Sequence, residues 1–234
     1  MSNIAKKVTI DLYTVQMKWV AWYLPIVYVL YFALVWFLKE PEIQEMSLLT
    51  FTFQTATIFM LVCGILSSII FLPLFVKQGV SRKSYFQGAL FSSIALALTI
   101  NGISVLLTWM ISLFNMTAFQ DVELSSLGAN SWVLTTIAYI ILVMLYFLVG
   151  WFIGSSFYRY GSSKGFIAII IGLITVTVND LLWTFSTPKP LTGLLNMSLP
   201  TPPVAIAFIG SIAIATIATI LAHKVVKEMP IKVG

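Results

Sequence analysis

The side chains that could do chemistry in this chain are few and scattered. His223 is the only histidine and Cys63 the only cysteine. The sequence has no paired-histidine metal motif, no Gly-x-Ser-x-Gly nucleophile elbow and no Gly-x-x-x-x-Gly-Lys phosphate loop. His223 falls at the end of an apolar run, where a cation suits a helix C-terminus, and Cys63 falls inside another run, where it packs as a small hydrophobe. We therefore expect no catalytic residue, no metal site and no ATP hydrolysis by this chain.

Two polar residues interrupt long apolar runs. Asp180 lies ~22 Å along the run that begins at Gly165, counted at about 1.5 Å per residue, which places it in the outer part of a bilayer. Ionisable groups at such positions are costly and often functional. Asp180 either lines a polar pathway or simply reaches the outer interface, which Trp183 would mark. Asn101 is expected to make an interhelical hydrogen bond. For both residues, a role in a substrate pathway and a purely structural role remain open.

The composition excludes a soluble domain. Of the 234 residues, 59% are hydrophobic and only 9% are charged, and the mean hydropathy is +1.00. A soluble protein carries about 25% charged residues, so this chain cannot cover a water-facing surface. We predict an all-α integral membrane protein forming one transmembrane domain over residues 1–234. Its six predicted spans, each long enough for a bilayer, are residues 20–38, 51–76, 89–114, 132–158, 165–185 and 204–222.

Residues 1–19 precede the first span and have a helical period of their own. Apolar residues at positions 4, 8, 12, 15 and 19 share one side, and Lys7, Asp11, Thr14 and Lys18 share another. This pattern predicts an amphipathic interfacial helix in the headgroup plane, with a frayed tail as the alternative. A signal peptide is disfavoured, because residues 20–38 exceed the apolar region of about 7–15 residues and no cleavage site follows.

Local signals are also present within the spans. Gly150 and Gly154 form a Gly-x-x-x-Gly pair, which favours close approach of another helix. Pro73 is expected to kink the second span near its end. Ser47 or Thr50 could cap the start of that span.

The charge distribution predicts the topology. Six spans place eleven of the thirteen basic residues on the side of the termini, and only Lys39 and Lys189 fall on the other. The positive-inside rule then puts both termini and segment 77–88 in the cytoplasm. The net charge of +5 therefore reflects these loops, and no nucleic-acid partner is expected.

Segment 77–88 is a short basic interruption between the second and third spans, and it begins with Lys77. Gly79 suggests a turn, and Ser81 suggests the cap of a helix, with Gly79 and Gly88 bracketing the segment. Arg82 and Lys83 would then lie in a first helical turn, where the dipole disfavours cations. That placement indicates a partner or lipid phosphates, and the alternative is a plain topology signal.

The order of these parts resembles a known family. An interfacial helix, two spans and the stretch Lys77-Gln-Gly-Val-Ser-Arg-Lys-Ser-Tyr-Phe-Gln-Gly88 leading into a third span look like the transmembrane subunit of an ABC-2-type (type V) ABC exporter. The resemblance implies that Lys77, Gly79, Ser81, Arg82 and Lys83 form a coupling segment that docks on a nucleotide-binding subunit. Family members often have a re-entrant element before the last span. Residues 186–203 are short and Pro-rich here, so that element is expected to be reduced.

The same resemblance implies a permease subunit in the plasma membrane of a bacterium. ATP and Mg²⁺ would be bound by the partner ATPase subunit, and a second copy or a related permease would complete the pathway. The apolar spans favour an amphipathic or hydrophobic substrate, such as a peptide, an antimicrobial or a lipid-like molecule. Two alternatives remain: a non-transporting accessory or sensor protein, and a secondary carrier, for which the chain offers few intramembrane polar groups.

Overall fold

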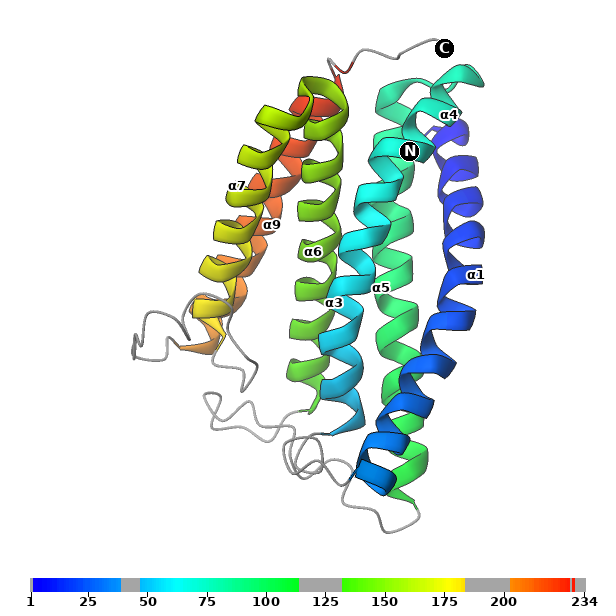
Figure 1. Cartoon of the computed structure of the whole chain (residues 1–234), viewed down its shortest axis with the longest axis vertical. Helices are drawn as coiled ribbons and strands as arrows, with labels where there is room; N and C mark the ends of the chain where they lie inside the picture. Colours follow the sequence, from blue (N-terminus) through cyan, green and yellow to red (C-terminus); the bar gives the residue numbers. More distant parts are fainter. Residues whose placement is uncertain (1, 39–46, 114–131, 184–202, 228, 230–234) are drawn as a thin grey trace.

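The protein is a bundle of long helices (Figure 1). The computed structural model describes residues 2–38, 47–113, 132–183, 203–227 and 229. Every element in these residues is helical: α1 (Asn3–Ala33), η1 (Leu34–Leu38), α3 (Leu48–Leu66), η2 (Ser67–Phe71), α4 (Leu72–Lys77), α5 (Arg82–Ser112), α6 (Trp132–Tyr160), α7 (Ser162–Leu182) and α9 (Val204–Lys227). Six helical stretches within them are long and apolar enough to cross a membrane. The predicted all-helical, multi-pass membrane fold is confirmed.

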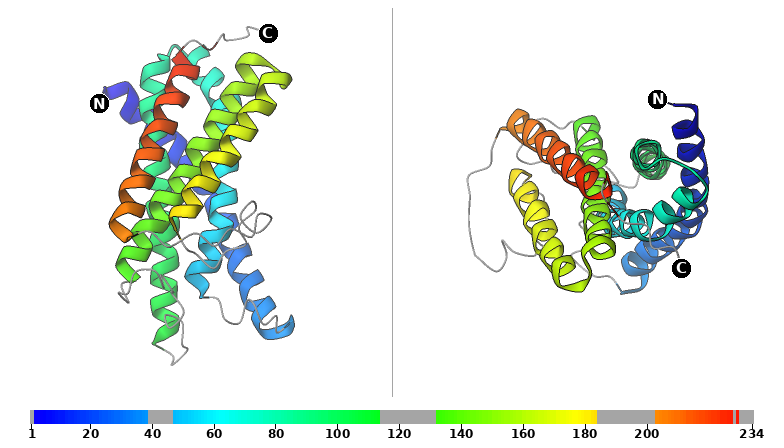
Figure 2. Two further views of the ribbon diagram at one scale, coloured as in Figure 1. Left: turned by 90° about the vertical axis from the view of Figure 1, so that its left-hand side faces the viewer. Right: turned by 90° about the horizontal axis from the view of Figure 1, so that it is seen from above.

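Helix α6 lies at the centre of the bundle. It packs against α3, α5, α7 and α9, while α1 packs on the outer side of α5 (Figure 2). In the most apolar stretch of α6, 56% of the residues are buried, compared with 17% in those of α1 and α9. Helix α6 is therefore the most buried of the six long helices, and α1 and α9 present apolar surface to the surroundings.

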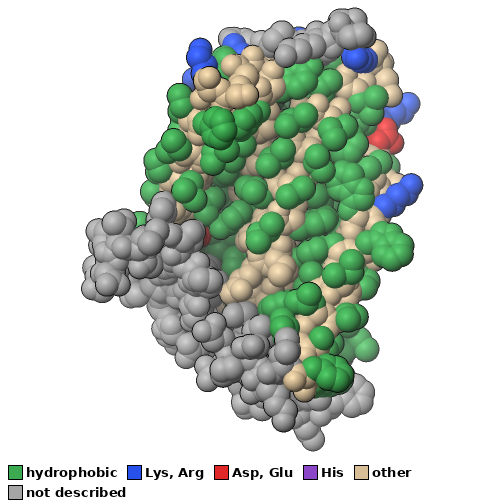
Figure 3. All heavy atoms as spheres, in the orientation of Figure 1, with side chains coloured by type: hydrophobic (Ala, Val, Ile, Leu, Met, Phe, Trp, Pro, Cys, Tyr) green, Lys and Arg blue, Asp and Glu red, His purple; other side chains and the backbone are tan. Residues whose placement is uncertain are grey.

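One end of the bundle, here called the basic end, gathers the cationic side chains. Helix α1 begins there, α9 ends there, and the turns that follow α4 and α6 lie there (Figure 1). Several Lys and Arg side chains lie at this end in Figure 3, while mainly apolar side chains cover the side of the bundle below it. Lys39, Lys189 and Lys232 lie outside the described residues, so the full segregation of charge stays a prediction.

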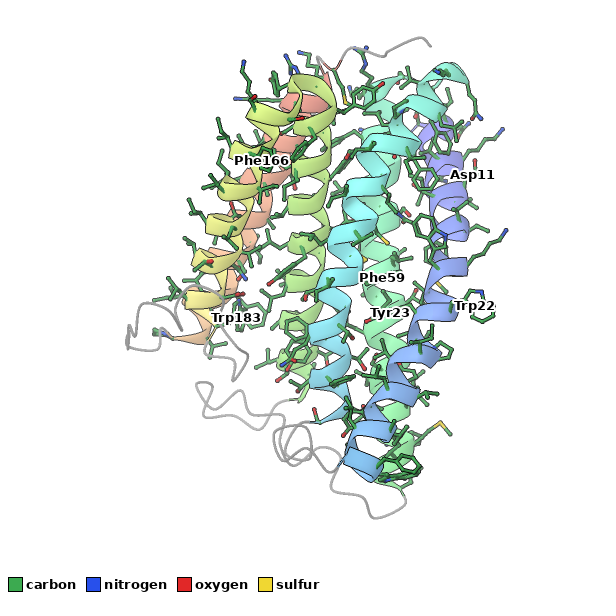
Figure 4. The ribbon with its side chains drawn as sticks, viewed as in Figure 1. Asp11, Trp22, Tyr23, Phe59, Phe166 and Trp183 are labelled. Atoms are coloured by element: carbon green, nitrogen blue, oxygen red, sulfur yellow. The ribbon has the colours of Figure 1, made fainter. Side chains whose placement is uncertain are left out.

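Helix α1 corrects the prediction of a separate interfacial helix over residues 1–19. It runs without a break from Asn3 to Ala33, so the amphipathic segment continues directly into the first span. The apolar side of this segment packs on α5, where Val8 is 2% and Leu12 1% exposed. The polar side faces outward, and Asp11 and Trp22 both point away from the bundle in Figure 4. The helical period was read correctly, but its apolar face is covered by another helix.

Three tyrosines fasten α1 to its neighbours along most of its length. Each shares a hydrogen bond with a hydroxyl group of α3 or α5: Tyr13 with Thr99 (2.9 Å), Tyr23 with Thr55 (2.8 Å) and Tyr28 with Ser104 (3.2 Å). The Tyr23 ring also stacks on Phe59 of α3 at 4.4 Å between centroids (Figure 4). Such polar bonds help associate helices in lipid, where apolar side chains gain little by meeting one another.

The α-helix of the second span is interrupted near Pro73, where the sequence predicts a kink. A π-helical turn, η2, separates α3 from α4, and Pro73 follows in the first turn of α4, where its missing N–H costs least. The predicted cap is also confirmed, since the Ser47 hydroxyl accepts a hydrogen bond from the Thr50 amide at 3.2 Å. The observed helices begin earlier or end later than several predicted spans, because they extend past the apolar runs at the basic end.

Three glycines let α3 and α6 approach closely. A Cβ atom on Gly150 would overlap the Leu61 carbonyl, and one on Gly64 would overlap the Phe147 carbonyl. A Cβ atom on Gly154 would overlap the Ser68 hydroxyl. The pair suggested by the sequence therefore faces α3, and Gly64 is its partner on the opposing helix.

Cys63 lies on the buried side of α3 and provides a test of the fold. Its side chain is 1% exposed, on the face of α3 that packs inward. We expect a membrane-permeant maleimide to leave Cys63 unlabelled in the folded protein and to label it after unfolding in SDS, because the reagent must reach the thiolate. Rapid labelling of the folded protein would contradict the observed packing.

Candidate functional site at the basic end

The turn between α4 and α5 has a defined backbone geometry. The Val80 amide bonds the Phe75 carbonyl at 3.0 Å, and the Gly79 amide bonds the Val76 carbonyl at 3.0 Å. These two bonds form a Schellman motif, in which the residue just after the helix end has a left-handed backbone conformation. Gly79 supplies it with φ of +86°, a conformation that costs glycine nothing. The turn predicted at Gly79 is therefore present, and its shape depends on that residue.

Ser81 starts α5 as the sequence predicted. Its hydroxyl accepts a hydrogen bond from the Ser84 amide at 3.2 Å, and Arg82 is the first helical residue. Gly88, which brackets segment 77–88 in the sequence, marks no break in the helix. Gly88 lies inside α5, where a Cβ atom would strike Val8 of α1. Segment 77–88 thus consists of the end of α4, a short turn and the first two turns of α5.

The cations of this segment differ in their surroundings. Lys77 and Lys83 are exposed, whereas Arg82 is half-buried and donates from Nη1 to the Lys227 carbonyl at 3.2 Å. Arg82 thereby satisfies a carbonyl at the C-terminus of α9. Among the residues that the structure describes, no carboxylate pairs with any of the three. Arg82 and Lys83 oppose the dipole of α5 from its first turn, so an external anion at this position would be favoured.

A buried polar cluster beneath the turn connects three helices. The cluster consists of Gln16, Ser67, Tyr85 and Ser92. The Tyr85 hydroxyl donates to the Ser67 carbonyl in η2 at 2.6 Å, and Gln16 of α1 donates to the Ser67 hydroxyl at 3.1 Å. The Ser92 hydroxyl donates to the Gln16 side-chain carbonyl at 3.3 Å. The π-helical turn is therefore held from two sides, by α1 and by α5.

An aromatic cluster beside it extends the connection to α6 and α9. Phe86 stacks on Trp151 of α6 at 4.7 Å between ring centroids and meets the edge of His223 of α9 at 4.6 Å. Tyr85 contacts Trp151 edge-on at 6.3 Å and is fully buried. The lone histidine thus packs against an aromatic ring, as expected for a structural residue.

Sequence reasoning missed both clusters. Tyr85 and Phe86 were read as part of an exposed basic segment because Arg82 and Lys83 precede them. The helical spacing of Tyr85, Phe86 and Ala89 could have indicated their burial, because it continues the apolar face of the third span. Gln16 carried no signal, because its partners lie 51 and 76 positions away in the chain.

The other predicted site residues lie away from the basic end. Asn101 donates to the Ala97 carbonyl of its own helix at 2.9 Å, so the expected interhelical bond is not the one it makes. Asp180 occupies the last turns of α7 and interacts electrostatically with Tyr146 of α6.

Two neighbours of Asp180 lie inward. Asn179 is fully buried, and neither atom of its amide has a hydrogen-bond partner among the described residues. Trp183 is not an exposed interface marker. It is 2% exposed, and its indole N–H donates to the Ser211 hydroxyl of α9 at 2.7 Å.

Comparisons with protein-family models, with curated proteins and with solved structures find no match to this chain. Function therefore has to be argued from the geometry above. The loop residues 186–203, where a reduced re-entrant element was expected, lie outside the described residues except for Pro203.

Proposed function

We propose that this chain is the transmembrane permease subunit of an ATP-driven exporter of the ABC-2 type, and that segment 77–88 docks on a separate ATPase subunit. One observation carries the proposal. The exposed cations Lys77 and Lys83 flank the turn between α4 and α5, and Tyr85 and Phe86, which follow Lys83 closely in α5, are buried against other helices. The proposed docking surface is thus continuous with the core of the bundle.

The connection gives the segment a mechanical role. Tyr85 bonds the π-helical turn of the second span, and Phe86 contacts α6 and α9. Displacement of the turn would therefore act on four of the six long helices, counting α5 itself. Closure of an ATPase pair below the membrane would move the turn, and the bundle would respond by a change in helix packing.

The remaining parts of the proposal follow from this assignment. The basic end faces the cytoplasm of a bacterium, in agreement with the positive-inside rule. ATP and Mg²⁺ are bound by the ATPase subunit and not by this chain. A second copy or a related permease completes the pathway, because six spans alone make a poor pathway. The substrate is amphipathic or hydrophobic, to suit the apolar walls.

Charge reversal at Lys83 tests the docking surface. We expect Lys83→Glu to weaken co-purification with the ATPase subunit encoded beside the gene about tenfold or more, because a favourable charge contact becomes a repulsion. Lys164→Glu is the matched control, since Lys164 is likewise exposed in the first turn of a spanning helix at the basic end. The double variant Arg82→Glu/Lys83→Glu should abolish binding.

The single variant is the sharper test of this surface. Arg82 also bonds the Lys227 carbonyl, so its replacement disturbs the bundle, whereas Lys83 makes no such bond. If the ATPase subunit binds the Lys83→Glu protein and the Lys164→Glu protein equally well and is stimulated equally by both, segment 77–88 is not the docking site.

Two glycines distinguish the coupling turn from an ordinary turn. Gly79 and Gly161 have φ of +86° and +79°, and neither has a neighbour that an added Cβ would strike. Replacement by alanine should cost each turn about 1–3 kcal/mol of backbone strain. We expect similar losses of thermal stability, but only Gly79→Ala should lower the ATPase rate of the assembled complex. Equal ATPase rates in the two variants would argue against a role for the Gly79 turn in coupling.

A further inference from the structure

A groove of about 420 Å³ lies between the first turns of α5 and the last turns of α9. The two helices lie beside each other at the basic end (Figure 2). Lys83 and Lys224 line the groove and are exposed, whereas Phe86 and Ile220 line it with apolar surface. Its volume is within the range of about 300–1,000 Å³ that small-ligand sites occupy.

The cations Lys83 and Lys224 lie at the outer end of the groove, and its deeper part is lined by Phe86 and Ile220 beside Gln87 and Thr219. Helix α5 runs away from the basic end, so Phe86 lies one turn deeper than Lys83. Helix α9 runs toward that end, so Ile220 lies one turn deeper than Lys224. At a rise of about 1.5 Å per residue, both apolar residues lie roughly 5 Å below the cations. A ligand that fills the groove must therefore carry an anionic head above an apolar tail.

A second hollow of about 120 Å³ adjoins the groove and adds two more cations. Arg82, Lys83 and Lys227 line it, together with Val226. No described carboxylate lines either hollow. Four cations from two helices thus lie around the two hollows. A bound anion would reduce the repulsion among these like charges.

We infer that this groove binds an anionic phospholipid of the surrounding bilayer. Its phosphate sits among Lys83, Lys224 and the cations of the adjoining hollow, and one acyl chain lies on Phe86 and Ile220. Cationic pockets between helices at a membrane surface suit anionic head groups for this reason. A soluble anion would leave the apolar wall exposed, and a zwitterionic lipid would leave the cations uncompensated. The inference shares Lys83 and Arg82 with the proposed docking surface, but its test needs only α5 and α9 of the isolated chain, so its failure can be distinguished from failure of the transport proposal.

The head-group contact is tested on the purified chain in neutral detergent, without an ATPase. Native mass spectrometry during titration with dioleoylphosphatidylglycerol or dioleoylphosphatidylcholine should show preferential retention of the anionic lipid. Lys224→Gln should weaken that retention about fivefold, which corresponds to ~1 kcal/mol for one lysine at a membrane surface. Lys164→Gln removes an exposed lysine outside the groove and should change retention by less than about twofold.

The acyl-chain contact is tested by filling the groove. Ile220→Trp should reduce retention of the anionic lipid severalfold, since the larger side chain occupies the apolar wall. Ile217→Trp is the matched control, because Ile217 is on the same helix, is 58% exposed compared with 51% for Ile220, and does not line the groove. Thermal stability of both variants should be measured alongside.

Three outcomes would overturn the inference. Equal retention of the two lipids would show that the cations do not select charge. Equal losses in Lys224→Gln and Lys164→Gln would show that only the overall charge matters. Displacement of the lipid by millimolar inorganic phosphate would assign the cations to a soluble anion. If Ile220→Trp does not fold, Lys224→Gln alone decides, because its exposed side chain leaves the packing intact.

Discussion

Gly150→Ala is expected to destabilise the protein by about 1–3 kcal/mol, and Gly150→Leu by more. A Cβ atom at position 150 would overlap the backbone carbonyl of Leu61, and a backbone group cannot rotate away as a side chain can. The two helices would have to separate, and α6 packs against four other helices. In lipid this packing is a main source of helix association, so the loss is not offset by a hydrophobic gain elsewhere.

Gly102→Ala is the control for this prediction. Gly102 lies inside α5, and an added Cβ atom would meet no neighbour within 4 Å. Alanine also has the higher helix propensity, so the variant should be as stable as the parent or slightly more stable. Stability can be followed by SDS titration with labelling of Cys63 as the readout, because this thiol is buried in the folded protein. Equal midpoints for Gly150→Ala and Gly102→Ala would refute the close approach of α3 and α6.

Tyr85→Ala should cost about 3 kcal/mol of stability, the low end of the range for a buried aromatic side chain. The low end applies because the unfolded reference in detergent or lipid already removes the ring from water. The substitution leaves a cavity between η2 and Trp151 and frees the Ser67 carbonyl of its side-chain donor. If the transport proposal holds, the variant should also bind the ATPase subunit while its ATPase rate loses sensitivity to substrate.

Two further substitutions separate the causes. Tyr85→Phe keeps the ring and removes only the hydrogen bond, so it should cost about 0.5–1.5 kcal/mol. Phe91→Ala removes an aromatic ring from the same helix at a position that is 47% exposed, and should cost far less than Tyr85→Ala. An effect of Tyr85→Phe as large as that of Tyr85→Ala would mean that the hydroxyl, and not the packing, holds the segment.

Several elements could be predicted because their causes are local. Apolar runs of bilayer length predict membrane spans wherever they occur. The composition has too few charged residues for these runs to belong to a water-soluble protein. The cap at Ser81, the cap at Ser47 and the turn at Gly79 follow from preferences of single residues for particular backbone geometries. Each of these expectations agrees with the structure, since no distant residue is needed to create them.

Other expectations failed because the deciding contact lies far away in the chain. The amphipathic pattern of residues 1–19 indicates that one face is covered, but it cannot say whether headgroups or α5 cover it. The sequence suggests a segment boundary at Gly88, whereas the structure places Gly88 inside α5 with Val8 of α1 packed against it. Asn101 bonds the Ala97 carbonyl of its own helix, an alternative that is open to any Asn side chain within a helix.

The sequence by itself determined that this protein has helices able to cross a membrane, that most of its cations are predicted to share one side and that a capped turn stands between the second and third spans. These properties depend on composition and on neighbours within a few residues. Only the tertiary structure decided that Tyr85 and Phe86 bind the turn to the core, that Gly64 packs against Phe147, and that Lys83 and Lys224 flank one groove. Such pairs are separated by tens of residues or more, and only the packing of whole helices brings them together.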